Sequence, residues 1–385
     1  MIKMMTAYTT EIDEIEDGLN EILSQIEPGS LRKNSVGILS CHFDFIEAGF
    51  IGKLREKLPF DIIGMTTMAS ANPFGINMYA LSLAVLTSDD VVFETAVTAP
   101  LVPGNCREEI RAAYTGARNK LSGPPSMIIG ILPYLRDLGG AELVRTIDDA
   151  CEGTPFWGGV ATNVDVSYEN CPAFHNDSLE PGVLPMILMR GNVNPEYVLV
   201  SIPKKNIREN RGIITGSDGC NLKAVNGIPV LRYTESLGVS MLNSAAGVMP
   251  LMVYYEGTAE PVALGVHGVN GDGSLHCAGE MPQGAAIALG EISVEGILST
   301  SGEAVKRVLQ SGRKGGALML PCVTRYMMLA PNQEGEMSLV SSMMKEGNMP
   351  FMLGYSCGEI CPVRDESGKL QNRYHNYTFS ACVLD

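Results

Sequence analysis

The sequence has little positive charge and no long apolar run. It carries 28 Lys and Arg against 43 Asp and Glu, which gives a formal net charge of −15. Because the basic residues form no cluster, a nucleic-acid partner is not expected. No apolar stretch reaches the roughly 20 residues that span a bilayer, and residues 1–25 are acidic where a secretory signal needs an apolar centre. We therefore expect a cytoplasmic protein without a membrane partner.

Cysteine spacings typical of metal or disulfide frameworks are also missing. The ten cysteines include no Cys-x-x-Cys pair, and Cys322 and Cys382 lie inside apolar runs. This pattern is typical of buried thiols in a reducing compartment. His267, His276 and Cys277 are close in sequence, but their spacing fits no zinc pattern. We expect neither a metal nor another cofactor.

What the chain does have is enough apolar sequence for a sizeable core, and a repeated pattern in it. Of its 385 residues, 45% are apolar, so two domains of ordinary size are expected. In Pro350–Ile360 an apolar run ends at a glycine and small polar or acidic residues follow. The pattern recurs in Pro59–Thr67 and Pro155–Thr162, and more loosely in Pro261–Gly265, at a spacing near 100 residues. The chain therefore resembles several copies of one unit.

The periodicity of the apolar residues predicts strands and helices that alternate. We expect helices over residues 11–26 (capped by Thr10), 46–57, 107–121, 140–151, 233–246, 294–310 and 336–346. Strands are expected at 36–40, 59–64, 126–132, 184–189, 317–322, 351–354 and 377–384, and a hairpin at 79–98 that turns at 88–90. These elements predict an α/β fold: mixed sheets built from repeated strand-helix-strand units with added antiparallel hairpins.

The tight-turn dipeptide Asn226-Gly227 suggests where the two domains divide. We predict a first domain over residues 1–224 with two units. The second, over 225–385, would hold one degenerate unit near Pro261 and one clear unit around Pro350–Ile360.

Five segments of the second half, in this order, carry a family resemblance. They are Leu222–Val230, Asp272–Gly284, Pro321–Arg325, Gly354–Ile360 and His375–Phe379. With them the chain resembles the FIST family. The resemblance implies a FIST N part followed by a FIST C part, and a bacterial sensory protein for signal transduction that binds small ligands such as amino acids. Because no output domain is recognised, a partner protein or a homo-oligomer would pass the signal on.

The candidate ligand site lies at the strand ends of the second half. Arg325 follows an apolar strand, where a guanidinium can clamp a carboxylate; the alternative is an ion pair with an acid such as Glu359. After the next strand, Ser356, Cys357 and Glu359 could orient the ligand. The residues expected to complete the site are Gly354, Gly358, Cys322, His375, Asn376, Thr66 and Trp157.

Several of these residues have a second interpretation. His375-Asn376 echoes His175-Asn176, which indicates a repeated structural hydrogen bond to a loop. Trp157 suits a core position. Gly354–Gly358 also matches the Gly-x-Ser-x-Gly elbow of hydrolases, with Ser356 as nucleophile, although Cys361-Pro362 argue against the helix that must follow it. A hydrolase using Ser356, a thiol enzyme using Cys357 or Cys322, and a scaffold without a ligand remain the alternatives to a sensor.

Overall fold

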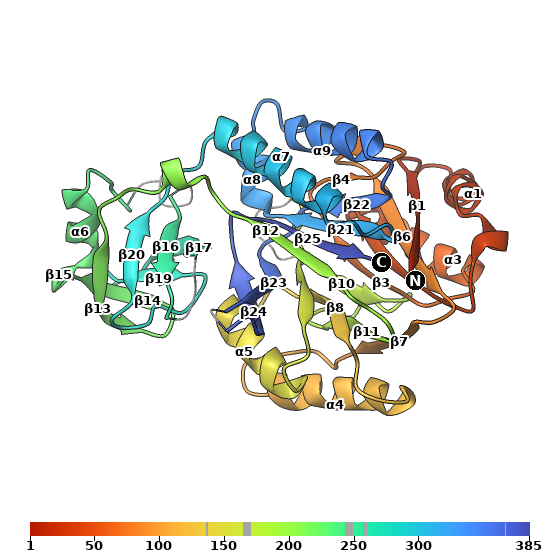
Figure 1. The fold of residues 1–385 in the computed structure, drawn as a ribbon, viewed down its shortest axis with the longest axis horizontal. Helices are drawn as coiled ribbons and strands as arrows, with labels where there is room; N and C mark the ends of the chain where they lie inside the picture. Colours follow the sequence, from red (N-terminus) through yellow and green to blue (C-terminus); the bar gives the residue numbers. More distant parts are fainter. Residues whose placement is uncertain (136–137, 165–170, 243–248, 257–259, 366) are drawn as a thin grey trace.

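The structure is a computed structural model, and it describes residues 1–135, 138–164, 171–242, 249–256, 260–365 and 367–385. A larger body carries both chain ends, and a smaller lobe lies beside it (Figure 1). No helix among the described residues is both long and apolar enough to cross a membrane.

The body consists of three units with the same order of elements. The first comprises β1 (Lys3–Thr9), α1 (Ile15–Gln25), β2 (Asn34–Cys41), α2 (Asp44–Glu47), α3 (Phe50–Lys57), β3 (Ile62–Thr66) and β6 (Leu81–Ser88). The second comprises β7 (Val92–Val97), α4 (Cys106–Lys120), β8 (Met127–Leu132), α5 (Gly140–Ala150), β9 (Phe156–Val160) and β11 (Pro185–Arg190). The third comprises β12 (Glu196–Val200), α7 (Val294–Gln310), β21 (Gly316–Pro321), α8 (Val323–Met328), α9 (Gly335–Glu346), β22 (Phe351–Gly354) and β25 (Phe379–Leu384).

Each unit arranges its strands in the same spatial order. The orders are β1-β6-β2-β3, β7-β11-β8-β9 and β12-β25-β21-β22. In each sheet the two strands joined through a helix run parallel, and the other neighbours run antiparallel. A parallel pair needs a long crossover, which the helix supplies. The predicted α/β class, with mixed sheets of repeated strand-helix-strand units, is confirmed.

The three units exchange strands in a cycle. From the first unit, β4 (Ser70–Ala71) and β5 (Ile76–Asn77) extend the sheet of the third by pairing with β22. From the second, β10 (Ala173–His175) extends the sheet of the first through β3. From the third, β23 (Glu359–Arg364) and β24 (Leu370–His375) extend the sheet of the second through β9. The two predicted halves of the chain therefore share sheets, and the domain boundary near residue 225 stays a prediction.

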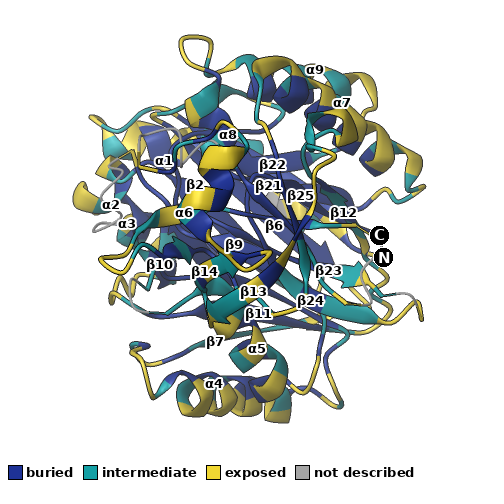
Figure 2. Ribbon diagram, turned by 90° about the vertical axis from the view of Figure 1, so that its left-hand side faces the viewer, coloured by how far each residue is buried: buried dark blue, intermediate teal, exposed yellow. Residues whose placement is uncertain are grey.

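The sheets bury both of their faces. Alternate residues of a strand point to opposite sides: Ile38 and Ile129 lie in an apolar cluster that all three sheets share, whereas Leu39 packs beneath α1 and α3. Buried residues accordingly run continuously along the central strands (Figure 2). This two-sided burial explains why the sequences of these strands are uninterrupted apolar runs.

The smaller lobe is inserted between β12 and α7. It holds β13 (Gly212–Asp218), β14 (Asn221–Val225), β15 (Ile228–Pro229), α6 (Val230–Ser236), β16 (Leu251–Tyr254), β17 (Val262–Leu264), β18 (Val266–Val269), β19 (Leu275–Cys277) and β20 (Ala286–Leu289). All its strand pairs are antiparallel, in the order β17-β16-β20-β13-β14-β19-β18. Only Gly265 separates the two end strands β17 and β18, so the sheet is a nearly closed barrel.

The lobe corrects the prediction of a degenerate third unit near Pro261. The short apolar strand β17 resembles the strand ends of the true units because it stops at a glycine. Its neighbours are antiparallel strands rather than helices. The helix predicted at 233–246 is correct only up to Ser236, where α6 ends; residues 237–242 are not helical, and the rest of the range lies outside the described residues.

Three local predictions in the body also differ from the structure. The first helix begins at Ile15, because Thr9 Oγ1 accepts the Glu11 amide in a turn before it. The helix predicted over 46–57 is broken into α2 and α3 at Gly49, whose φ is 72°. The predicted 79–98 hairpin is wrong: β6 and β7 turn apart into different sheets. Each unit therefore ends at the point where the next begins.

Candidate functional site

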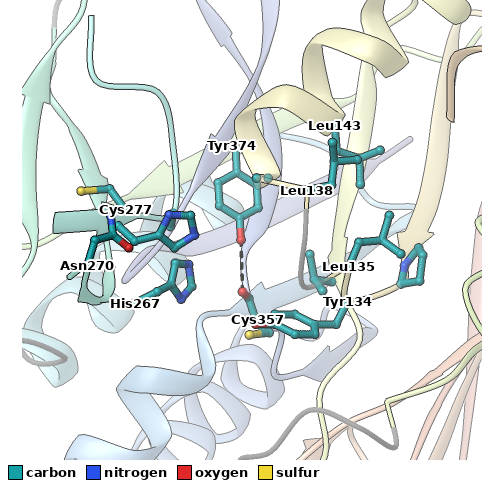
Figure 3. A pocket seen from close by; sticks show the side chains of 15 residues that line it. Tyr134, Leu135, Leu138, Leu143, His267, Asn270, Cys277, Cys357 and Tyr374 are labelled. Carbon is teal, nitrogen blue, oxygen red and sulfur yellow. Dashed lines mark hydrogen bonds between the residues drawn. The ribbon is translucent and has the colours of Figure 1, made fainter. Parts of the chain in front are cut away.

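A cavity of about 500 Å³ lies where the lobe meets the body (Figure 3). Strand β18, the turn after it and β19 supply one wall, and the start of α5 with the segment before it supplies the opposite wall. Residues from the third unit complete it. The lining residues are Pro133, Tyr134, Leu135, Leu138, Gly139, Gly140, Leu143, Val160, His267, Asn270, His276, Cys277, Ala278, Cys357 and Tyr374.

The contribution of the third unit is a strand end held by Tyr374. Cys357 is half-buried and follows β22, and the Tyr374 hydroxyl donates a hydrogen bond to its carbonyl oxygen at 3.2 Å. Gly358 has φ 146°, and a Cβ there would lie 1.9 Å from the Tyr374 hydroxyl. Only glycine fits this position, so Gly358 allows the tyrosine to reach the cavity.

The lobe contributes two imidazoles side by side. The rings of His267 and His276 have centroids 5.8 Å apart, and β18 bulges at His267 where its register with β19 shifts. His276 Nδ1 is 3.2 Å from Asn221 Oδ1, which also accepts the Asn270 amide at 3.0 Å. Burial, with the neighbouring His276, lowers the pKa of His267, so this imidazole is neutral near pH 7.

Helix α5 starts at the cavity. Its N-terminal residues Gly139 and Gly140 line the wall, and no side chain caps the first turn. A helix N-terminus has unpaired amide groups and the positive end of the helix dipole. Gly140 also leaves room for the Tyr374 ring, because the Cβ of any other residue at position 140 would lie only 2.4 Å from that ring. This wall therefore favours an anionic group.

Behind Cys357 lies a buried carboxyl group. Glu359 is fully buried; its two oxygens accept hydrogen bonds from Ser356 Oγ at 2.8 Å and Thr378 Oγ1 at 2.7 Å. Burial raises the pKa of Glu359 to about 8, although the two hydroxyl donors oppose the rise. Glu359 therefore holds its proton more tightly than an exposed glutamate does. Burial and the nearby Glu359 also raise the pKa of Cys322.

Comparison with protein families identifies the chain. The FIST N domain matches residues 35–227 and the FIST C domain matches residues 229–362. The chain belongs to the FIST family. The FIST N match covers most of the first two units, whereas the FIST C match joins the lobe to the third unit, and the cavity receives residues from both matches.

Comparison with solved structures finds only weak likeness to this FIST chain. A cyanuric acid hydrolase from A. caulinodans has a TM-score of 0.36 at 8% identity, over 100% of this chain and 98% of that one. PurL of T. maritima complexed with AMPPCP has a TM-score of 0.20 at 10% identity, and the match covers 100% of this chain and 72% of PurL. Likeness at this level supports no conclusion. A search of curated proteins finds no match.

Arg325, the predicted clamp of the FIST C part, lies elsewhere. It belongs to α8, an unpredicted helix, and is 1% exposed. Its guanidinium forms an ion pair with Glu336 at 2.7 Å and bonds further to Ile297 O, Tyr377 O and two hydroxyls. The alternative of an ion pair is confirmed, but the partner is Glu336 rather than Glu359. Sequence patterns did not single out Glu336, because the relative placement of the consecutive helices α8 and α9 decides which acid meets the guanidinium.

Cys357 is the predicted site residue that lines the cavity, and Gly358 lies behind the wall, against the Tyr374 hydroxyl. Ser356 is buried beside Glu359, and Cys322 is bridged to Ser356 on the neighbouring strand. Gly354, from the same strand end, packs against Met65 and Ser40. None of these three lines the cavity.

The remaining predicted residues lie in other surroundings. Thr66 is buried at the end of β3, where its carbonyl accepts the Thr162 amide at 3.1 Å. Trp157 lies in the shared central cluster and donates to Ser380 Oγ at 2.9 Å, which agrees with the core interpretation. Asn376 joins the body to the lobe: its Oδ1 accepts the Gly265 amide at 3.2 Å.

The repeated His-Asn pairs do form structural bonds. Asn176 and Asn376 both accept a backbone amide through Oδ1, from Ile62 and Gly265 respectively. The left-handed backbone falls on Asn176 itself in the first pair, with φ 54°, but on the following residue Tyr377 in the second, with φ 60°. The amide oxygen thus receives the bond, whereas a bond to a loop carbonyl was predicted. His375 is buried and bonds the backbone of Cys361.

The hydrolase elbow around Ser356 lacks its defining helix. Strand β23 begins at Glu359, directly after Gly358, and Ser356 Oγ is bonded to Glu359 inside the protein. The geometry therefore does not present Ser356 to a substrate in the cavity.

Sequence reasoning missed most of the cavity wall. Tyr134, Asn270 and Tyr374 were not singled out, and the two histidines were considered only as metal ligands. Within the described residues no three His, Cys, Asp or Glu side chains gather as a metal site. A usable signal was the placement of His267 and His276 on either side of the tight turn at 270–274, which brings them together on paired strands.

Proposed function

We propose that the chain is a sensory protein that binds a small carboxylate or an amino acid in the cavity between lobe and body. The observation that carries the proposal is a cavity of about 500 Å³, within the range of roughly 300–1,000 Å³ usual for small-molecule sites. The FIST family, a family of sensory domains, supports the same class of function.

Polar groups on the cavity wall suit both ends of an amino acid. A carboxylate would lie at the start of α5, where the helix dipole and the amides of the first turn favour negative charge. An ammonium group would be accepted by Asn270 Oδ1, since Asn221 and Ser274 take up only the amide nitrogen of Asn270. Each imidazole adds a donor or an acceptor according to its tautomer.

Apolar side chains on the same wall as the start of α5 would accommodate the rest of the ligand. Leu135, Leu138 and Leu143 lie together beside Tyr134 (Figure 3). This arrangement favours an amino acid or carboxylate with an apolar side chain over a highly charged one. The binding signal would then be passed on by a partner protein or by a homo-oligomer.

Isothermal calorimetry with a panel of amino acids and small carboxylates tests this proposal. We expect at least one compound to bind, and Asn270→Ala or Tyr374→Phe to weaken it about 10-fold, because each removes one hydrogen-bonding group at the cavity. Lys53→Ala is the matched control, since Lys53 is exposed on α3, far from the lobe. Absence of binding across the panel, or equal affinity in all four proteins, would reject the proposal.

A thiol enzyme is the second candidate, because Cys357 is only half-buried at the cavity. Iodoacetamide labelling followed by peptide mapping separates the two functions. Rapid modification of Cys357 that His267→Ala slows, together with turnover of a bound compound, would favour the enzyme. Binding without modification favours the sensor.

A further inference from the structure

A second cavity, of about 220 Å³, lies on the other side of the turn between β24 and β25. It shares no lining residue with the first cavity. Its walls are the end of β12 with the segment after it, one face of α7 and the strands β16 and β17 of the lobe. The lining residues are Leu199, Val200, Ser201, Ile202, Pro203, Lys204, Ile207, Met252, Glu260, Pro261, Ala263, Thr300, Glu303, Arg307, His375 and Thr378.

His375 contributes a buried acceptor to this wall. The side chain is 3% exposed, and its ring bonds the backbone of Cys361, while Nε2 is buried with no hydrogen-bond partner among the described residues. Since Nε2 has no partner, Nδ1 is the nitrogen that bonds Cys361, and Nε2 then carries the lone pair of a neutral imidazole. Burial also lowers the pKa of His375 to about 3, so the ring stays neutral over the physiological range.

An unpaired buried acceptor is costly, by about 1–3 kcal/mol. Native proteins rarely keep such a group unless a ligand or water completes it. Ser201 Oγ is a second buried polar atom with no partner in the described part of the chain. His375 and Ser201 both line this cavity, so a polar molecule bound there would complete both atoms.

The charges at the rim cancel. Lys204 pairs with Glu260 at 2.9 Å, and Arg307 pairs with Glu303 on the same face of α7. The rim therefore demands no net charge from the occupant, unlike the first cavity, where the start of α5 favours an anion. The smaller volume also excludes most compounds that would fill the first cavity.

We propose that this second cavity binds a small compound that donates a hydrogen bond, through a hydroxyl or an amino group, to Nε2 of His375. Ser201 Oγ holds another polar group of the same compound. Amino alcohols, short diols and simple amines have this chemistry. The site is separate from the one proposed above, so either can fail while the other stands.

Nuclear magnetic resonance of the protein with ¹⁵N-labelled histidine tests the proposal directly. Ethanolamine, ethylamine and ethanediol are the probes. We expect the Nε2 signal of His375 to shift in a saturable way with at least one of these probes. A shift with ethanediol but not with ethylamine would identify a hydroxyl group as the donor. A shift with ethylamine but not with ethanediol would identify an amino group. No shift with any probe, or soaked crystals with only water at Nε2, would overturn it.

Variants separate this site from the first. Ser201→Ala removes one polar atom and is expected to weaken probe binding at least 5-fold without loss of the fold; His375→Phe is expected to abolish it. Asn270→Ala, in the first cavity, should leave probe affinity unchanged. Equal probe affinity in Ser201→Ala and wild type, or loss of probe binding in Asn270→Ala, would contradict a separate site.

Discussion

Glu359 shows how a single buried group can make the fold depend on pH. Its carboxyl lies between Ser356, next to Cys357 of the first cavity, and Thr378, which lines the second. Burial raises the pKa of this carboxyl to about 8, far above the pKa of about 4.3 of an exposed glutamate. Ionisation would place a charge between the two cavities.

We expect the free energy of unfolding to fall as the pH rises from about 4.5 to about 8. The folded state binds the Glu359 proton more tightly than the unfolded state does, so the stabilisation is complete below the unfolded pKa and is lost as the pH passes the folded one. Urea unfolding at several pH values measures this dependence. Glu359→Gln should flatten it, and an unchanged slope in that variant would assign the dependence to other groups.

Arg325 and Glu336 form an ion pair that is almost fully buried, 1% and 0% exposed. Removing one partner leaves the other charge buried and unpaired, which costs about 3–5 kcal/mol. We therefore expect Arg325→Met to destabilise the protein by about that amount in urea unfolding, with no direct effect on ligand contacts.

The double variant Arg325→Met with Glu336→Leu is the control for that prediction. It removes both charges together and should recover much of the lost stability. If the double variant were as unstable as the single one, the packing around α8 rather than the unpaired charge would explain the loss.

At the scale of elements, the exchanged strands decide where the cavity residues lie. Strands β23 and β24 belong to the third unit but pair with β9 of the second, and this pairing carries Tyr374 to the start of α5. Backbone bonds lock the crossing: the Val160 amide donates to Gly358 O, and the Cys357 amide donates to Val160 O, both at 2.9 Å. The first cavity therefore depends on contacts between units.

For the whole molecule, the lobe behaves as an insertion into one of three equivalent units. Its two ends are adjacent, because Ile207 bridges Gly290 and the Arg208 amide donates to Leu289 O at 2.9 Å. The strand pairs of the body include no strand of the lobe. The lobe nevertheless shares an apolar cluster with α4 and α5.

We expect replacement of residues 208–289 by a short Gly-Ser linker to leave the body folded but less stable, because part of the shared cluster becomes exposed. Circular dichroism and thermal unfolding measure both effects. Binding to either cavity should be lost, since His267, Asn270 and Ala263 are removed. An unfolded product would show that the lobe is required for the body to fold.

Patterns in the amino-acid sequence were enough to predict the repeated unit, the positions of most helices and strands, and the family. A strand buried on both faces needs an uninterrupted apolar run, as in β8 and β21, and an amphipathic helix such as α7 needs its own periodicity. These signals are local, so residues within a short stretch are enough to show them. The same locality explains the wrong prediction at Pro261–Gly265, where a barrel strand has the apolar run of a repeated unit.

Which residues meet at the cavity and at the buried ion pair depends on the three-dimensional fold. Cys357 was predicted at the ligand site, and it reaches the cavity, but His267, Tyr134 and Tyr374 join it from segments far apart in the sequence. Arg325 was the preferred clamp, yet its donors are taken up by Glu336 and backbone carbonyls. Strand exchange joins segments that are far apart in the chain, and the acid that meets Arg325 depends on how α8 and α9 are placed. The apolar periodicity of one sequence records neither.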